Sequence, residues 1–452
     1  MSKFMPLTQG EIEEMLREIS IETIEELFDD IPPELKISMV EAPRGRTEYE
    51  VKRHVMKILS KNKPYSTMPL FLGGGVWPHY VPSVVKYLSA LPEFVTGYTP
   101  YQPEISQGIL QALFEYQSMI CELTGMDVAN ASMYDWASSL GEAALMALRV
   151  TGKKEIVIPQ AISPEREAVL KTYIHGKATI RKVAYDVETG MIDLEGLQNV
   201  ISKETAGVYI ENPNYFGVIE CEAEEAGKIA HEVDAIFIVG VDPISLGVLT
   251  PPGDYGADIV IGEGQPLGVG LNFGGPLLGI FTCRNDKKMI RNMPGRIIGI
   301  TEDYEGNRCY TITLQTREQH IRREKATSNI CSNETLCAVQ AAIYMAYMGP
   351  KGIEQVAKVC MANARYLMKK IDAINGFKAP IFSAPHFKEF TVRTDFPSTE
   401  VHKTLINSGV HGGKMLKDEF PELGEAFLFC VTEVHTEEDV EALIKALSSI
   451  SS

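Results

Sequence analysis

The fold is decided by six short, β-branched segments: EIVIP (Glu155–Pro159), TIRKVAYD (Thr179–Asp186), AGVYIENP (Ala206–Pro213), AIFIVGVDP (Ala235–Pro243), DIVIGEG (Asp258–Gly264) and LLGIFTC (Leu277–Cys283). Helix-like segments lie between them, at Pro164–His175, Leu194–Lys203 and Ala223–Val233. Alternation of strand and helix patterns predicts βα crossovers and a mostly parallel sheet buried on both faces. Ligands of such sheets bind beyond the carboxyl ends of the strands.

The chain before this region has a different pattern. Thr8 and Glu11 form a possible capping box, and apolar residues follow at helical spacing (Ile12, Met15, Leu16 and Ile19). The pair Pro32–Pro33 then interrupts the pattern. We predict that residues 1–67 form a helical N-terminal arm that packs on a surface outside the arm itself.

The chain after about Asn333 changes to long helical patterns. Leu336, Val339, Ile343 and Tyr347 mark one apolar face, and strand candidates follow at Glu389–Arg393 and Ala426–Val431. This mixture predicts a smaller C-terminal α+β domain. The predicted domains are therefore residues 1–67, 68–332 and 333–452, which suits a chain of 452 residues.

Composition narrows the range of partners and compartments. The formal net charge of −17 disfavours nucleic acids and anionic membranes as partners, because both are polyanions. The eight cysteines show no C-x-x-C pair, and no apolar run reaches the length of a membrane span. We predict a cytoplasmic protein with reduced thiols and either a small-molecule or a protein partner.

Asp242 ends one predicted strand, and the turn GEGQPLG (Gly262–Gly268) follows the next one. A carboxylate at a strand end either caps the following turn or holds the protonated pyridine nitrogen of pyridoxal phosphate. Pyridoxal enzymes of the large aminotransferase-like class carry their Schiff-base lysine some two dozen residues after such an aspartate. This turn offers Gln265 in that place.

Four further segments carry a resemblance to a known family: GYTPYQPEISQG (Gly97–Gly108), ANASMYD (Ala129–Asp135), GGP (Gly274–Pro276) and TREQHIRREKATSNIC (Thr316–Cys331). They resemble the N-terminal half of the P-protein family of glycine decarboxylases, in the form that exists as a separate subunit. The resemblance covers nearly the whole chain. It implies an aminotransferase-like fold of the pyridoxal phosphate fold type I for the large domain.

The resemblance also implies that two subunits have different roles in the reaction. In this family the catalytic half carries a His-Lys-Thr turn whose lysine binds pyridoxal phosphate, and Gln265 stands in that place here. A carboxamide forms no imine, so we expect no covalent cofactor in this chain, with Asp242 and Gln265 as vestiges of the site. Lys325, in another segment, is the alternative Schiff-base lysine and is more readily interpreted as a surface or interface cation.

The loop that contains Tyr98, Tyr101, Gln102, Glu104 and Gln107 is stiffened by two prolines, which lowers the entropic cost of presenting its side chains. Such a loop either caps the adjacent helix or reaches across an interface. We expect it to contact the active site of the lysine-bearing partner.

Other motifs receive structural interpretations. The glycines of Gly262–Gly268 have the wrong spacing for a dinucleotide fingerprint, and His320 with Cys331 and Cys337 does not match a zinc pattern. The segment Ser138–Glu142 begins a predicted helix. In true pyridoxal enzymes the N-terminus of the corresponding helix holds the cofactor phosphate, but the bulk of Trp136 disfavours a phosphate site here. Gly73–Gly75 suits either an anion loop or a tight turn.

The resemblance implies a subunit of glycine decarboxylase of the glycine cleavage system. With a lysine-bearing subunit, two copies of each, it would decarboxylate glycine, release CO2 and pass the aminomethyl group to the lipoyl arm of H-protein. The partner would hold the pyridoxal phosphate, and no metal is expected. Two alternatives remain open: a scaffold subunit without an active-site role, and a stand-alone pyridoxal enzyme.

Overall fold

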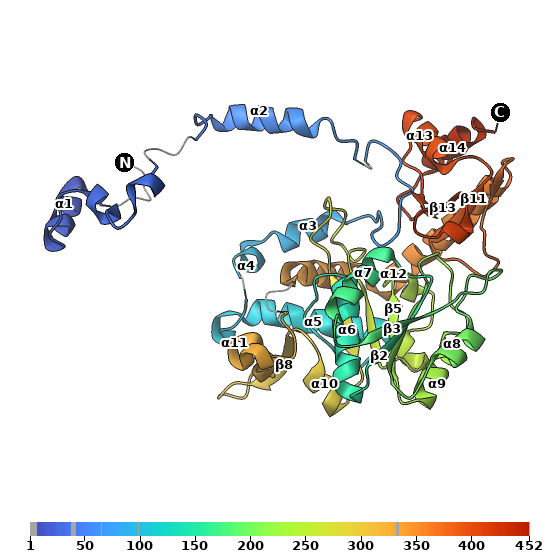
Figure 1. Ribbon diagram of the computed structural model, residues 1–452, viewed down its shortest axis with the longest axis horizontal. Helices are drawn as coiled ribbons and strands as arrows, with labels where there is room; N and C mark the ends of the chain where they lie inside the picture. The colour runs from blue at the N-terminus through green and yellow to red at the C-terminus, as the bar shows by residue number, and fades with distance from the viewer. Residues whose placement is uncertain (1–6, 38–41, 65, 98, 331–333, 452) are drawn as a thin grey trace. The chain divides into compact units, whose positions relative to one another are not determined.

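The computed structural model describes residues 7–37, 42–64, 66–97, 99–330 and 334–451. Its contacts divide the chain into two compact units, Met1–Lys63 and Pro64–Ser452. The first unit contains the predicted helical arm, and the second contains the large sheet and a smaller C-terminal sheet (Figure 1). Among the helices in these ranges, none is both long and apolar enough to cross a bilayer.

The arm consists of short, well-capped helices: α1 (Gln9–Glu18), the 3-10 helices η1 (Ile24–Phe28) and η2 (Pro33–Leu35), and α2 (Glu48–Leu59). The capping box predicted at Thr8 and Glu11 is present, and Thr47 with Glu50 forms a second one. No described residue before Pro64 is buried. Local capping therefore defines these helices, while their apolar side chains remain exposed.

The large sheet has seven strands in the order β1-β7-β6-β5-β4-β2-β3. Strands β2 to β6 pair in parallel, and β7 and β1 pair antiparallel at one side. This confirms the mostly parallel sheet. The strands are β1 (Val128–Ala129), β2 (Glu155–Pro159), β3 (Thr179–Val183), β4 (Thr205–Glu211), β5 (Ile236–Val241), β6 (Ile259–Glu263) and β7 (Gly279–Cys283).

Helices cover both faces of this sheet (Figure 1). Alternate strand residues face opposite ways, so Ile156 packs in one core cluster with α6, whereas Val157 packs in another with α8 and α9. The helices of this unit before α12 are α3 (Ser83–Ser89), α4 (Pro92–Val95), α5 (Gln107–Thr124), α6 (Trp136–Thr151), α7 (Pro164–Tyr173), α8 (Leu194–Val200), α9 (Ala223–Glu232), α10 (Lys287–Asn292) and α11 (Gln319–Arg322). Short 3-10 helices connect them: η3 (Pro103–Ile105), η4 (Ser245–Gly247), η5 (Pro252–Tyr255), η6 (Gln315–Arg317) and η7 (Arg323–Lys325).

The C-terminal part contains the long helix α12 (Thr335–Asp372), which is interrupted at Gly349, and a four-stranded antiparallel sheet. The elements of this part are β10 (Phe377–Lys378), β11 (Glu389–Thr394), α13 (Ser398–Asn407), β12 (Lys414–Met415), η8 (Pro421–Leu423), β13 (Ala426–Cys430) and α14 (Glu437–Ser448). Both predicted strands, β11 and β13, are present. The short strands β10 and β12 were not predicted because two residues carry no periodicity.

The apolar face predicted for the start of α12 was correct at Val339, which is buried, and at Ile343, which packs against the same core, but wrong at its two ends. Leu336 and Tyr347 are 38% and 62% exposed, whereas Ala338, Ala341 and Met345 are buried. Small side chains line the buried face because α12 packs closely against α3 and α5. The hairpin of β8 (Ile297–Glu302) and β9 (Arg308–Thr313) was also missed by the sequence analysis.

Candidate functional site: a small buried pocket and an exposed loop

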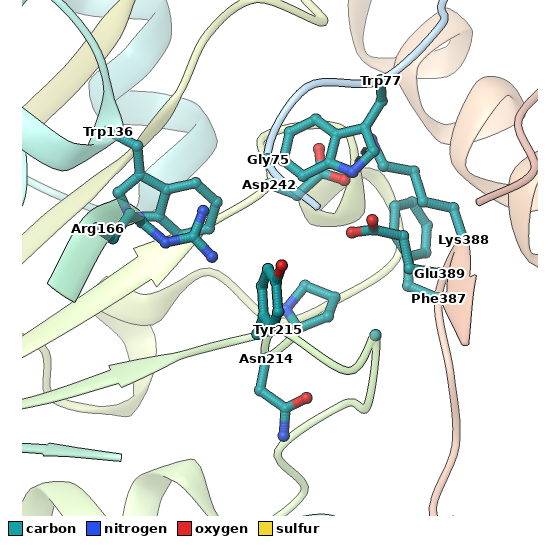
Figure 2. Close-up of a pocket in the computed structure, with 12 residues that line it drawn as sticks. Gly75, Trp77, Trp136, Arg166, Asn214, Tyr215, Asp242, Phe387, Lys388 and Glu389 are labelled. Atoms are coloured by element: carbon teal, nitrogen blue, oxygen red, sulfur yellow. Dashed lines mark ion pairs between the residues drawn. The ribbon is translucent and has the colours of Figure 1, made fainter. Parts of the chain in front are cut away.

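The carboxyl ends of the central strands bring three acidic side chains to one edge of the sheet. Glu211 ends β4, Asp242 follows β5 and Glu263 ends β6, and all three are buried. A small pocket lies at this edge, where the loop around Trp77 and the start of β11 also converge (Figure 2). It occupies the place where open α/β sheets bind their ligands.

Gln265 lies in this region and binds the backbone of a distant segment through its side-chain amide. Its side-chain carbonyl accepts a hydrogen bond from the Trp77 backbone N–H, and its amide group donates to the Trp77 backbone carbonyl, both at 3.0 Å. Gln265 is fully buried. The position expected for a Schiff-base lysine therefore fixes the segment that carries the Trp77 indole.

Asp242 pairs with a buried lysine from the C-terminal part of the chain. Its Oδ2 atom lies 2.5 Å from the Lys388 ammonium, and its Oδ1 atom accepts the Ile244 backbone N–H at 3.1 Å. The ammonium also lies 3.9 Å from the Trp77 ring centroid, within cation–π distance. Asp242 thus both caps its turn and neutralises an internal cation.

A chain of hydrogen bonds extends from Lys388. The ammonium donates to His79 Nε2 at 2.8 Å, so the proton of the neutral imidazole is assigned to Nδ1, which lies 2.8 Å from a Glu433 carboxylate oxygen. Burial, followed by the Lys388 charge, lowers the pKa of His79. Although burial alone raises the pKa of Glu433, the hydrogen bond from His79 and the other favourable contacts bring it to about 2.

The nearby thiol of Cys360 brings three potential metal ligands, with His79 and Glu433, within 4.8 Å of one another. The thiol lies 3.5 Å from Glu433, and the His79–Glu433 distance of 2.8 Å is that of a hydrogen bond. Because Lys388 occupies the other imidazole nitrogen, a metal ion here would also lie close to an ammonium group. We interpret these side chains as part of the hydrogen-bonded chain.

A second buried pair fills the other side of the pocket. Arg166 makes two contacts of 2.8 Å with Glu211, and its guanidinium lies 4.0 Å from the Trp136 ring centroid. The Trp136 indole donates to the Tyr209 hydroxyl at 3.0 Å. Although burial opposes its charge, the Glu211 carboxylate raises the pKa of Arg166, which stays protonated.

These side chains leave almost no space. Figure 2 shows the two indoles, Arg166 and Lys388 directed around the same pocket, whose cavity is only about 20 Å³. That is enough for about one water molecule, whereas small-molecule pockets usually enclose roughly 300–1,000 Å³. Pyridoxal phosphate does not fit among the side chains present.

The loop predicted to reach a partner is exposed and firmly held. Tyr98 lies outside the described residues; Gln102 and Glu104 are exposed, and Tyr101 is 42% exposed. Gln107 instead bonds its own chain: its side chain donates to the Tyr310 backbone carbonyl at 2.9 Å and accepts the Tyr310 N–H at 2.8 Å. Gln107 therefore anchors the loop to β9.

The structure also places the alternative candidates. Lys325 is exposed in η7 and does not line the pocket with Asp242. Gly74 and Gly75 have φ angles of +94° and +137°, which supports the tight turn as the reason for these glycines. Cys331, of the unmatched zinc pattern, lies outside the described residues.

The sequence analysis missed two cations of this site, Lys388 and Arg166. Lys388 lies 309 residues from His79, and its pairing depends on how the two sheets meet. No local pattern marks a lysine before a strand as buried. The only available signal was its position directly before the apolar strand β11.

Comparisons with known proteins are consistent over the full length. A family model described as "Glycine cleavage system P-protein" matches residues 2–447. The chain is 52% identical to the probable glycine dehydrogenase (decarboxylating) subunit 1 of Pyrococcus horikoshii, with 97% of each chain covered. It is 50% identical to the protein of that name from Staphylothermus marinus, with 99% of this chain and 98% of the relative covered.

Solved structures agree. A crystal structure of glycine decarboxylase (P-protein) of the glycine cleavage system, in inhibitor-bound form, superposes with a TM-score of 0.90 at 39% identity, covering 99% of this chain and 100% of that one. A sphingosine-1-phosphate lyase of Burkholderia pseudomallei, at 15% identity and a TM-score of 0.66, shares the fold; the match covers 92% of this chain and 93% of that one. The chain belongs to the glycine cleavage system P-protein family.

Proposed function

We propose that this chain is the subunit without cofactor in a two-subunit glycine decarboxylase. A partner subunit supplies the lysine and the pyridoxal phosphate, and the assembly contains two copies of each chain. The complex decarboxylates glycine, releases CO2 and transfers the remaining aminomethyl group to the lipoyl arm of H-protein. We place it in the cytoplasm, in keeping with the free thiols of all seven cysteines in the described ranges.

The observation that carries this proposal is the filled pocket. In a member of the P-protein family, Gln265 occupies the expected lysine position and holds Trp77 over the Lys388 ammonium that neutralises Asp242. A carboxamide forms no imine, and a cavity of about 20 Å³ admits no cofactor. A chain of this family with such a pocket needs a second subunit for the chemistry.

The loop around Tyr101 supports a role beyond that of a scaffold. Its side chains are presented outward while Gln107 fixes it to β9, so binding does not require the loop to become ordered. We propose that Tyr101, Gln102 and Glu104 complete the partner's active site by orienting glycine or excluding water. A scaffold subunit has no such requirement, and the two proposals differ in what a loop mutation does.

The decisive experiment compares the chain alone with the chain mixed with its lysine-bearing partner. Borohydride reduction and mass spectrometry should find a pyridoxyl group on the partner and none on this chain. Glycine-dependent CO2 release should require both. A stoichiometric adduct on Lys325, or on any lysine of this chain, would instead support the stand-alone enzyme.

A second experiment tests the loop. In the assembled enzyme, Tyr101→Phe or Glu104→Gln should lower kcat/KM by about tenfold or more, or about 1.4 kcal/mol of transition-state stabilisation. The cofactor spectrum and the assembly should be unchanged. If both variants assemble and turn over glycine at the wild-type rate, the subunit is a scaffold.

A further inference from the structure

Tyr101 contacts a polar cluster from a distant part of the chain, which consists of the buried side chains of Arg296 and Glu318 and the exposed ring of His320. The Arg296 guanidinium donates a hydrogen bond to the Tyr101 hydroxyl at 2.7 Å and lies 5.1 Å from the ring centroid. Arg296 is 4% exposed and lies 3.4 Å from the Glu318 carboxylate, which is itself buried. The His320 ring packs edge-on against Tyr101, with centroids 5.6 Å apart. The phenol therefore has a defined position at the protein surface.

The direction of the Arg296 hydrogen bond determines what Tyr101 can do. A guanidinium only donates, so the phenol oxygen acts as the acceptor and its own O–H group points to another partner. No described residue accepts that hydroxyl proton. A cation on the oxygen side withdraws electron density from the O–H bond, and hydrogen bonds are strongest when the acceptor is charged. Tyr101 is thus prepared to donate to an anionic oxygen.

The surroundings favour an anion as well. The segment that carries His320 also lines a neighbouring cavity of about 490 Å³, whose lining includes Arg291, Arg317, Arg322 and Lys325 and no carboxylate. In a chain with a net charge of −17, this is a local excess of positive charge. Glu318, in the same segment, offsets part of this charge beside Arg296 and His320, but the four cations of the cavity outnumber it. A region of net positive charge lowers the energy of a nearby anion and raises that of a cation.

We propose that the Tyr101 hydroxyl donates a hydrogen bond to the carboxylate of glycine bound in the partner subunit, and that Arg296 is the residue that positions it. This inference rests on the proposed function, because it needs the loop to enter the partner's site. Glu318 holds the guanidinium, and His320 limits rotation of the phenol ring. The contact orients the substrate carboxylate without proton transfer or a covalent step.

The test compares glycine with methylamine, which has the amine but no carboxylate. Each compound is titrated into the assembled enzyme, and its dissociation constant is read from the spectral change in the cofactor. Tyr101→Phe should weaken glycine binding about tenfold, or about 1.4 kcal/mol, and leave methylamine binding within about twofold. Arg296→Lys should produce part of the same loss, because lysine keeps the charge but has no planar fork to fix the phenol.

The matched control is Tyr366→Phe. Tyr366 is also 42% exposed and also lies beside a cation, with Lys370 5.3 Å from its ring centroid, but it belongs to α12. It should change neither affinity. Thermal unfolding of each variant identifies any loss of folding caused by Arg296→Lys, and Tyr101→Phe tests the carboxylate contact even if that variant fails to fold.

The outcomes separate the inference from the proposed function. If Tyr101→Phe weakens the binding of glycine and methylamine equally, the proposed carboxylate contact is wrong. Loss of the cofactor from this variant would also overturn it, because the phenol would then bind a cofactor oxyanion instead. A folded Arg296→Lys variant with unchanged glycine affinity overturns the positioning role. If Tyr101→Phe changes nothing, the loop does not enter the site, while partner-dependent CO2 release still supports the decarboxylase assembly.

Discussion

Gln265 and Trp77 lie 188 residues apart, yet the side-chain amide of one satisfies both backbone hydrogen-bonding groups of the other. This double contact places an indole at the edge of the sheet where pyridoxal enzymes of this fold hold their cofactor. At the position where we expect the Schiff-base lysine of this class, a glutamine side chain offers no nucleophilic amine. Its carboxamide instead fixes the segment that carries the Trp77 indole.

Gln265→Ala should destabilise the folded chain substantially. Each buried backbone group left without a partner costs about 1–3 kcal/mol, so the free energy of unfolding should fall by at least about 2 kcal/mol. Urea denaturation measures this directly. Gln111→Ala, on the exposed side of α5, is the control and should change it by less than about 0.5 kcal/mol. If Gln265→Ala lowered the free energy of unfolding no more than Gln111→Ala does, the hydrogen bonds between Gln265 and Trp77 would contribute nothing to stability.

Gln265→Lys should not convert the chain into a pyridoxal enzyme. The nearby pocket would still be a cavity of about 20 Å³, because two indoles and two cations line it. We expect no cofactor absorbance and no reducible adduct on this lysine. Glycine-dependent CO2 release by the variant chain alone would contradict this prediction.

Lys388→Met should be more damaging than the corresponding double substitution. Removing one partner of a buried ion pair typically costs about 3–5 kcal/mol, because the remaining charge has no partner. Adding Asp242→Asn removes that charge and should recover much of the loss. A double-mutant cycle of unfolding free energies measures the coupling between Lys388 and Asp242. Additive effects would mean that the 2.5 Å contact does not stabilise the fold.

Glu263 should make stability depend on pH. Burial raises the pKa of this carboxyl group to about 8, although three backbone N–H groups oppose the shift. Its contribution to stability is therefore fully present below the unfolded pKa of about 4.3 and is lost as the pH rises through 8, with a slope of up to about 1.4 kcal/mol per pH unit. Glu263→Gln removes that slope. The unfolding free energy of the wild type minus that of the variant should fall from pH 5 to pH 8, and a constant value would contradict the assignment.

Deletion of the arm should separate folding from assembly. The arm, Met1–Lys63, and the rest of the chain, Pro64–Ser452, are separate compact units, so a chain that starts at Pro64 should still unfold cooperatively on its own. Exposed side chains such as Met15, Ile19 and Phe28 give the arm an apolar surface, which we expect a partner subunit to cover. Sizing chromatography with the lysine-bearing subunit should show weakened association. Unchanged association at micromolar concentration would exclude the arm as an interface.

Local patterns predicted the parts of the fold that depend on neighbouring residues. The six strands of the central region are present within a few residues of their predicted ranges, because β-branched runs bounded by helical segments define a buried parallel sheet. The capping box at Thr8 also needs only residues close in sequence. Features without a periodic signal were missed, such as the two-residue strand β1 and the face of α12 that packs on α3 and α5.

The sequence by itself determined that no lysine stands at Gln265, because residue type alone decides whether an imine forms. It also determined the family and the alternation that builds the sheet. Only the tertiary structure decided that the pocket is filled, since Trp77, Arg166 and Lys388 come from three separate segments. It likewise decided that Arg296 supports Tyr101 across 195 residues. Hydrogen bonds and ion pairs between distant segments depend on how the elements pack, and no spacing along the chain encodes that packing.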